Sequence, residues 1–177
     1  EEALTDFLQA TILDDSHGDA FLALGRLYRD TGDYEAARGA FARAGKLRPD
    51  DAEVALALGV TAALENKSDE ARQHFESARA ANPRFTAVYL NLGVLELESG
   101  NLDLARREFA RALASRFDSP EALNNMALME NLERFSPDSL KKFDQALASG
   151  RHRERILCNL GAVQMRWGLW KEASSTF

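Results

Sequence analysis

Residues of the same type recur along this chain every 34 positions, and this spacing constrains the fold more than any other feature. Phenylalanine occupies one register position throughout, at Phe7, Phe41, Phe75, Phe109, Phe143 and Phe177. An alanine follows three positions after each of the first five phenylalanines. A second series holds a small residue, at Gly25, Gly59, Gly93, Ala127 and Gly161. Self-similarity at a fixed period of this length is typical of repeat proteins, so the sequence predicts a repeat array.

Each repeat is predicted to be a pair of α-helices. Ala37, Phe41 and Ala44 follow the i, i+4, i+7 spacing of a helix face, not the alternation of a strand. The segment 30–33 contains a glycine and is typical of a turn, while Pro49 stands where a second helix has to end. The small Gly25 lets two antiparallel helices approach closely, and a large phenylalanine fills the space beside it. We therefore expect an all-α fold of helix hairpins that are stabilised by stacking.

These residues reproduce the pattern of the tetratricopeptide repeat family, which the chain resembles along essentially its whole length. The first complete copy carries the pattern at Leu24, Gly25, Tyr28, Gly32, Tyr34, Ala37, Phe41, Ala44 and Pro49. The resemblance implies a right-handed superhelix, an α-solenoid, built of antiparallel helix hairpins. It also implies a concave wall formed by the first helix of each repeat.

The repeats are numbered here from position 1, which is Gly18 in the first complete copy. The prediction is a single array over residues 1–177. Its parts are the second helix of a partial repeat at 1–17, full repeats at 18–51, 52–85, 86–119 and 120–153, and a truncated repeat at 154–177. Asn66 replaces the turn glycine in the second repeat, and Arg134 replaces it in the fourth. Ser136 followed by Pro137 predicts an N-cap and a second helix that begins later than in the other repeats.

Composition and charge exclude several classes of function. A net charge of -6 argues against nucleic-acid binding, which needs clustered Lys and Arg. The longest nearly apolar stretch, Val54–Leu64, is much shorter than the roughly 20 residues that cross a bilayer, so we expect no membrane insertion. One cysteine, Cys158, allows no internal disulfide, and the histidines share no metal-ligand spacing. Because no nucleophile–base pair or phosphate loop is recognisable, we predict no enzymatic activity, cofactor or metal.

The sharpest local signal for function is a row of asparagines at position 6. Asn91, Asn125 and Asn159 are spaced by one full repeat. A primary amide offers one acceptor and two donors, so such a row can pair with the N–H and C=O groups of an extended peptide. The row resembles the asparagine ladder in the arm of O-linked N-acetylglucosamine transferase, which implies capture of a peptide backbone. The alternative is that these asparagines are solvated residues without a ligand.

Other side chains on the expected concave wall complete the predicted peptide-binding surface. Hydrogen bonds from three asparagines contribute about 0.5 to 1.5 kcal/mol each, and a micromolar complex needs about 8 kcal/mol, so apolar contacts must supply the rest. Arg155 belongs to the basic run 151–155, which could take an acidic ligand end. Leu22 and Arg26 stand where the family's carboxylate clamp has Lys and Asn, so that clamp is not reproduced. The predicted surface comprises Leu22, Arg26, Leu56, Val60, Leu90, Val94, Asn124, Leu128, Asn131 and Arg155 beside the three asparagines.

We expect a protein-interaction scaffold that binds a partner peptide or helix. Two alternatives stay open: self-association through uncapped ends, as in a bacterial envelope, pilus or secretion assembly, and a substrate-recruiting arm of a larger enzyme. The sequence leaves the compartment undecided between cytoplasm and bacterial periplasm. Trp170 takes the usual tyrosine position and is predicted to be core, Trp167 to be exposed in a turn, and Cys158 to be a packing residue.

Overall fold

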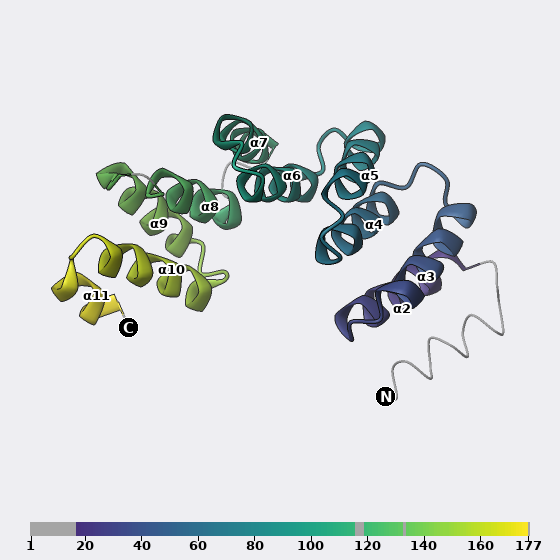
Figure 1. Cartoon of the computed structure of the whole chain (residues 1–177), viewed down its shortest axis with the longest axis horizontal. Helices are drawn as coiled ribbons and strands as arrows, with labels where there is room; N and C mark the ends of the chain where they lie inside the picture. Colours follow the sequence, from purple (N-terminus) through teal and green to yellow (C-terminus); the bar gives the residue numbers. More distant parts are fainter. Residues whose placement is uncertain (1–16, 116–118, 133, 177) are drawn as a thin grey trace. The chain divides into compact units, whose positions relative to one another are not determined.

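The structure is a computed structural model that describes residues 17–115, 119–132 and 134–176. Within these ranges every regular element is an α-helix, which confirms the predicted all-α fold class (Figure 1). None of the helices in the described ranges is long and apolar enough to cross a membrane. The predicted partial repeat at 1–17 lies outside the described residues, His17 excepted. The helices are α2 (Gly18–Asp30), α3 (Tyr34–Leu47), α4 (Ala52–Leu64), α5 (Ser68–Ala81), α6 (Thr86–Glu98), α7 (Leu102–Ser115), α8 (Pro120–Glu130), α9 (Pro137–Ala148), α10 (Arg153–Arg166) and α11 (Trp170–Thr176).

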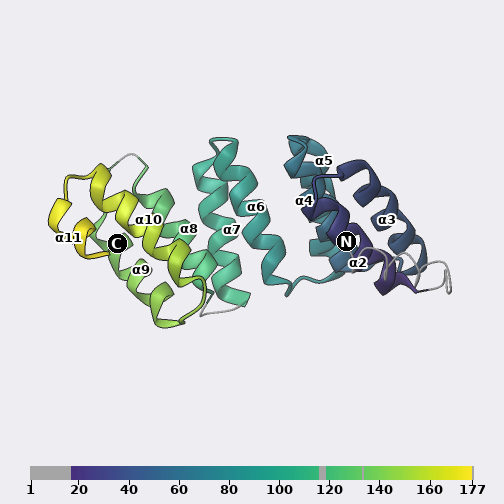
Figure 2. The ribbon, with the colours of Figure 1, turned by 90° about the horizontal axis from the view of Figure 1, so that it is seen from below.

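The chain divides into two compact units, unit 1 (Glu1–Asn91) and unit 2 (Leu92–Phe177), and the division falls inside α6. Whether the two units continue as one array, as the sequence predicts, stays a prediction. Unit 1 holds the hairpins α2/α3 and α4/α5, and unit 2 holds α8/α9 and α10/α11. The two helices of each hairpin lie side by side (Figures 1 and 2). Neighbouring first helices also touch, α2 with α4 in unit 1 and α8 with α10 in unit 2.

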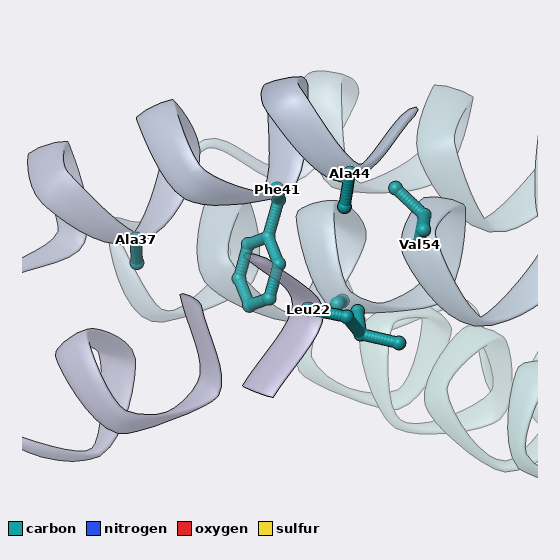
Figure 3. Close-up of a cluster of buried hydrophobic side chains, with 6 residues drawn as sticks. Leu22, Ala37, Phe41, Ala44 and Val54 are labelled. Atoms are coloured by element: carbon teal, nitrogen blue, oxygen red, sulfur yellow. The ribbon is translucent and has the colours of Figure 1, made fainter. Parts of the chain in front are cut away.

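Within the hairpins, a buried phenylalanine fills the space that a glycine leaves on the facing helix. The Phe41 ring is fully buried, and a Cβ added at Gly25 would come within 2.4 Å of it. Figure 3 shows this ring extending from α3 among Leu22, Ala44 and their neighbours in the core of unit 1. The same arrangement recurs at Gly59 with Phe75 and at Gly93 with Phe109. The glycine series and the phenylalanine series of the sequence therefore describe the two sides of one repeated packing contact.

Most turns inside the hairpins have a left-handed residue at position 15. Gly32, Asn66, Gly100 and Gly168 have φ of 84°, 61°, 78° and 75°. A Cβ disfavours this region for most residues, but glycine adopts it freely and asparagine tolerates it. The second repeat therefore keeps the regular turn, and α5 begins at the same repeat position as α3.

The fourth repeat departs from this pattern, as predicted. Arg134 occupies position 15 in place of the turn glycine. Helix α8 accordingly ends two repeat positions earlier than α2, and α9 begins at Pro137, one position later than α3. Ser136 is the N-cap residue, as predicted, although its side chain makes no capping hydrogen bond. Without a residue suited to the left-handed region, the chain takes a longer turn.

A buried amide stabilises this longer turn. Asn131 Nδ2 donates to the Ala127 carbonyl at 2.7 Å and to Ser139 Oγ at 2.5 Å. Its Oδ1 accepts from the backbone N–H of Ser136 at 3.2 Å. Asn131 is 2% exposed, so its hydrogen-bonding groups serve the turn and offer no surface to a ligand. We therefore leave Asn131 out of the candidate binding surface.

The two tryptophans and the cysteine differ from expectation. Trp170 is 65% exposed on α11, so its assignment to the core is wrong, since no described element covers it. Trp167 is partly buried against the core of unit 2, and its ring lies 6.3 Å from that of Phe135, centroid to centroid. Phe135 belongs to the long turn of the fourth repeat, which explains why Trp167 is covered. Cys158 is exposed and free, not packed.

Candidate functional site

Three asparagine side chains form a hydrogen-bonded chain across α8 and α10 in unit 2. Asn159 Nδ2 donates to Asn124 Oδ1 at 3.0 Å, and Asn124 Nδ2 donates to Asn125 Oδ1 at 3.1 Å. Asn124 is only 2% exposed, whereas the other two are partly exposed. A buried amide thus connects two accessible amides on neighbouring repeats. We call Asn124, Asn125 and Asn159 the amide chain.

The amide chain leaves a free donor group, Nδ2, at Asn125 and a free acceptor, Oδ1, at Asn159, which also keeps its second Nδ2 hydrogen. Asn125 uses its Oδ1 and keeps Nδ2, while Asn159 uses one Nδ2 hydrogen and keeps Oδ1, and neither kept atom bonds another described residue. If Nδ2 and Oδ1 were exchanged in all three amides, the free donor would lie on Asn159 and the free acceptor on Asn125. The amide chain would still offer a donor at one end and an acceptor at the other. An extended peptide presents one C=O and one N–H per residue, which are the complements of these groups.

Local sequence fixes the position of the amide chain. Helix α8 starts with Pro120 in its first turn, and the Ser119 Oγ accepts a capping hydrogen bond from the Ala122 N–H at 3.4 Å. Because α8 and α10 are the first helices of consecutive repeats and touch, residues about one repeat apart lie across from one another. Asn124 is buried between them with both ends of its amide bonded, so its burial leaves no unpaired polar group.

Apolar side chains lie on α8 and α10 and in the turn that follows α8, and some of them are accessible. Leu128 is partly buried against the core of unit 2. Leu132 is 39% exposed and Met165 is 41% exposed. Sequence reasoning did not single out these last two residues, although they occupy positions 13 and 12, which the family resemblance assigns to the concave wall. Arg166 Nη2 donates to the Leu132 carbonyl at 2.7 Å and ties the end of α10 to the preceding repeat.

Charged groups lie at the opposite end of the same two helices. His152 Nε2 lies 2.7 Å from Glu121 Oε1, and the Ser119 hydroxyl donates to Glu121 Oε2 at 3.0 Å. Burial by itself would raise the pKa of Glu121. Its own backbone N–H, the Ser119 hydroxyl and the positive charges of His152 and Arg151 outweigh burial, so the pKa is lowered from 4.5. Arg155 is exposed nearby in the first turn of α10 and makes no ion pair with a described residue.

The lowered pKa of Glu121 predicts a loss of stability in acid. Because the folded pKa lies below the unfolded one, the carboxylate stabilises the fold above about pH 4.5, and this contribution is lost as the pH falls through the folded pKa. We expect Glu121→Gln to flatten the decline in the free energy of unfolding below pH 4.5, measured by urea unfolding at a series of pH values. Glu35→Gln, at an exposed glutamate of unit 1, serves as the control. Equal slopes for Glu121→Gln and the unmodified chain would contradict this role for Glu121.

In unit 1 the predicted surface residues differ in their exposure. Leu22 is 3% exposed and belongs to the core around Phe41, so it is not accessible to a ligand. Arg26 is exposed, but its Nη2 lies 3.0 Å from Glu53 Oε2 and links α2 to α4. Leu56, Val60 and Leu90 are all partly buried.

Asn91 is the last residue of unit 1, and its amide bonds within its own helix, α6. Its Nδ2 donates to the Ala87 carbonyl one helical turn earlier, at 2.8 Å. Its Oδ1 makes no hydrogen bond with a described residue and its side chain is partly exposed. Val94, the first residue beyond it on the predicted surface, is 37% exposed and belongs to unit 2. The alignment of Asn91 with Asn125 stays a prediction.

Family comparison identifies the repeat. Models described as tetratricopeptide repeat match residues 1–52, 22–84 and 62–129. The chain belongs to the tetratricopeptide repeat family. This fold implies a protein–protein interaction scaffold. No curated protein matches the chain.

Solved structures of other proteins share the fold of this tetratricopeptide repeat chain. The Cut9–Hcn1 hetero-tetramer of the APC/C matches with a TM-score of 0.88 and 18% identity over 99% of this chain, which spans only 35% of that one. PilW, a type IV pilus biogenesis factor, matches with a TM-score of 0.81 and 21% identity. The match covers 97% of this chain and 80% of PilW. YrrB, which has an unusual peptide-binding site, matches with a TM-score of 0.64 and 18% identity. The match covers 96% of this chain and 88% of YrrB. At these identities the likeness shows the fold alone.

Among the described residues, no group of three or more His, Cys, Asp or Glu side chains is arranged to hold a metal ion.

Proposed function

We propose that this chain is a non-catalytic scaffold that binds an extended peptide segment of a protein partner through the peptide backbone. The ligand groups are Asn125 Nδ2 and Asn159 Oδ1, the free ends of the amide chain. Asn124 acts as the positioning residue, because it orients both accessible amides and is itself buried. The proposal extends the resemblance to the asparagine ladder of O-linked N-acetylglucosamine transferase.

The single observation that supports this proposal most is the unpaired donor and acceptor on adjacent first helices. Two isolated solvated asparagines would have no fixed relation to one another. Here Asn124 joins them across two repeats, so the donor and the acceptor are oriented before a ligand arrives. Preorganised polar groups lose less side-chain entropy on binding than free ones.

Other groups on α10 and in the turn after α8 have to supply most of the affinity. Two net hydrogen bonds contribute about 1 to 3 kcal/mol, well short of the roughly 8 kcal/mol of a micromolar complex. Leu132 and Met165 are exposed apolar side chains that a peptide can cover, at about 25 cal/mol for each Å² of apolar surface removed from water. Arg155 is available for a carboxylate of the peptide. The partner class is therefore an extended segment with apolar side chains and an acidic group toward one end.

The test uses peptides selected by display from a random library on the intact chain, with affinities measured by fluorescence anisotropy. Asn125→Ala combined with Asn159→Ala is expected to weaken the selected peptides at least about tenfold, since both backbone contacts are lost. Gln145→Ala removes an exposed amide from the second helix α9 and is the matched control, with no expected loss.

Thermal stability separates binding from folding in this test. The double variant leaves the buried Asn124 amide without either partner, so its melting temperature is expected to fall, and affinities are compared well below that temperature, where circular dichroism shows the variant to be folded. Unchanged peptide affinity in the double variant, or equal losses in the variant and the Gln145→Ala control, would overturn the proposal.

A further inference from the structure

A hollow lies in unit 1, on a different face from the predicted peptide-binding positions. It has a volume of about 580 Å³ and lies between the C-terminal halves of α3 and α5 and the start of α4. Its apolar lining includes Gly45, Val54, Ala55, Leu58 and Ala81. Ala55 occupies repeat position 4, whereas the predicted surface residues of the same helix, Leu56 and Val60, occupy positions 5 and 9.

The hollow exists because two positions that are large elsewhere in the chain are small here. At position 4, the other complete repeats and the last one carry Phe21, Tyr89, Leu123 and Leu157, and the second repeat has Ala55. At position 28, the later repeats carry Arg79, Leu113 and Leu147, and the first has Gly45. Missing side-chain volume at both places leaves neighbouring atoms without contact partners.

The next repeat shows which side chain fits such a place. Tyr89 stands at position 4 of the third repeat and is 8% exposed. Its hydroxyl donates to the Pro83 carbonyl at 2.6 Å. A tyrosine therefore buries its ring against the start of a first helix and pairs its polar end with the connecting loop. The corresponding loop carbonyl in front of α4 belongs to Pro49, for which no hydrogen bond to a described residue is found.

The rim of the hollow carries excess negative charge. Asp50 is exposed and makes no ion pair with a described residue. Arg48 is the basic residue of this rim, and it is already shared between Asp19 and Asp51. His74, which also lines the hollow, lies 3.9 Å from Glu70. A ligand with a positive charge beside its apolar group complements this rim.

We infer that the hollow at Ala55 and Gly45 is a docking site for a tyrosine side chain of a partner protein, presented next to a basic residue. The ring takes the space that Tyr89 fills one repeat later, and the adjacent cation lies against Asp50. Aromatic side chains seated in preformed pockets are typical anchors of protein interfaces. This docking site uses none of the residues of the amide chain and is independent of the function proposed above.

The experiment titrates three acetylated dipeptide amides, Lys-Tyr, Glu-Tyr and Lys-Ala, into the ¹⁵N-labelled chain and follows amide chemical shifts. Lys-Tyr is expected to shift the Gly45, Ala55 and Leu58 resonances saturably, and to bind about threefold to tenfold more tightly than Glu-Tyr. Lys-Ala is expected to produce no saturable shift at these residues. Equal binding of Lys-Ala and Lys-Tyr, or no shift at these residues with Lys-Tyr, would overturn the inference.

Two variants fill the hollow and are each expected to abolish the Lys-Tyr shifts. Ala55→Phe restores the side chain that the first repeat has at position 4. Gly45→Leu provides a second route if the first variant misfolds, because a Cβ at Gly45 meets only Val54 Cγ1, at an ordinary 3.5 Å. Ala42→Phe adds the same ring at an exposed site on α3 outside the hollow and is expected to leave binding unchanged. Lys-Tyr binding that survives both filling variants, each folded by circular dichroism, would place the ligand elsewhere.

Discussion

Replacing Phe41 with alanine is expected to lower the free energy of unfolding by about 3 to 5 kcal/mol. The ring is fully buried between α2 and α3, where it contacts Leu22 and the glycine on the facing helix. Its removal loses the transfer free energy of the ring and leaves a cavity that two helices already in close contact cannot close. Urea unfolding followed by circular dichroism measures the change.

Leu64→Ala is the control for the loss of Phe41, because Leu64 is 49% exposed on α4. Surface substitutions of this kind usually change stability by no more than about 0.5 kcal/mol. A Phe41→Ala variant as stable as Leu64→Ala would contradict the packing role of the phenylalanine series.

Two glycine-to-alanine changes in the same hairpin are expected to have opposite signs. At Gly25 the new Cβ would lie 2.4 Å from Phe41 Cε1, on a ring that is itself fully buried and cannot move aside. We expect Gly25→Ala to destabilise the chain by about 1 to 3 kcal/mol. At Gly39, within α3, a Cβ would meet nothing within 4 Å, so Gly39→Ala is expected to stabilise by about 0.5 to 1 kcal/mol through helix propensity.

The difference between these two variants is the informative quantity, because both change the same atom in the middle of a helix. Urea unfolding of the two variants and the parent chain measures it. If Gly25→Ala proved as stable as Gly39→Ala, the close approach of α2 to α3 would not be the reason for the glycine series.

Much of the fold follows from the sequence because steric demands repeat with the period. Pairing of the Gly25 and Phe41 series requires two helices to approach closely at a constant offset, and helix hairpins meet this requirement at Gly25, Gly59 and Gly93. The turn geometry can also be predicted from the sequence, because a glycine or asparagine at position 15 indicates a residue in the left-handed region. Ser136 followed by Pro137 located the irregular fourth repeat, in which α9 begins at Pro137.

The candidate site is harder to predict from the sequence, because the neighbouring helix decides whether a side chain of the site is exposed. Position 5 holds Leu22, which is buried by the core of unit 1, and Cys158, which is exposed. Asn124 occupies the same position and looked like one more surface amide, yet it is buried and bonded to both neighbours. The periodicity of the sequence does not distinguish an amide that positions its neighbours from an amide that binds the peptide. The pattern predicted that position 6 matters, but not that a buried partner would join two of its members.

Backbone recognition by the amide chain is tested most directly by changing the peptide backbone itself. A selected peptide is prepared with one amide after another replaced by an ester, which removes a single N–H donor and leaves the side chains intact. With the protein that carries no substitution, an ester at one position of the peptide is expected to weaken binding by about threefold to tenfold, because Asn159 Oδ1 loses its donor. In Asn159→Ala the same ester is expected to cost nothing further. Equal losses in both proteins at every ester position would show that Asn159 does not bind the peptide backbone.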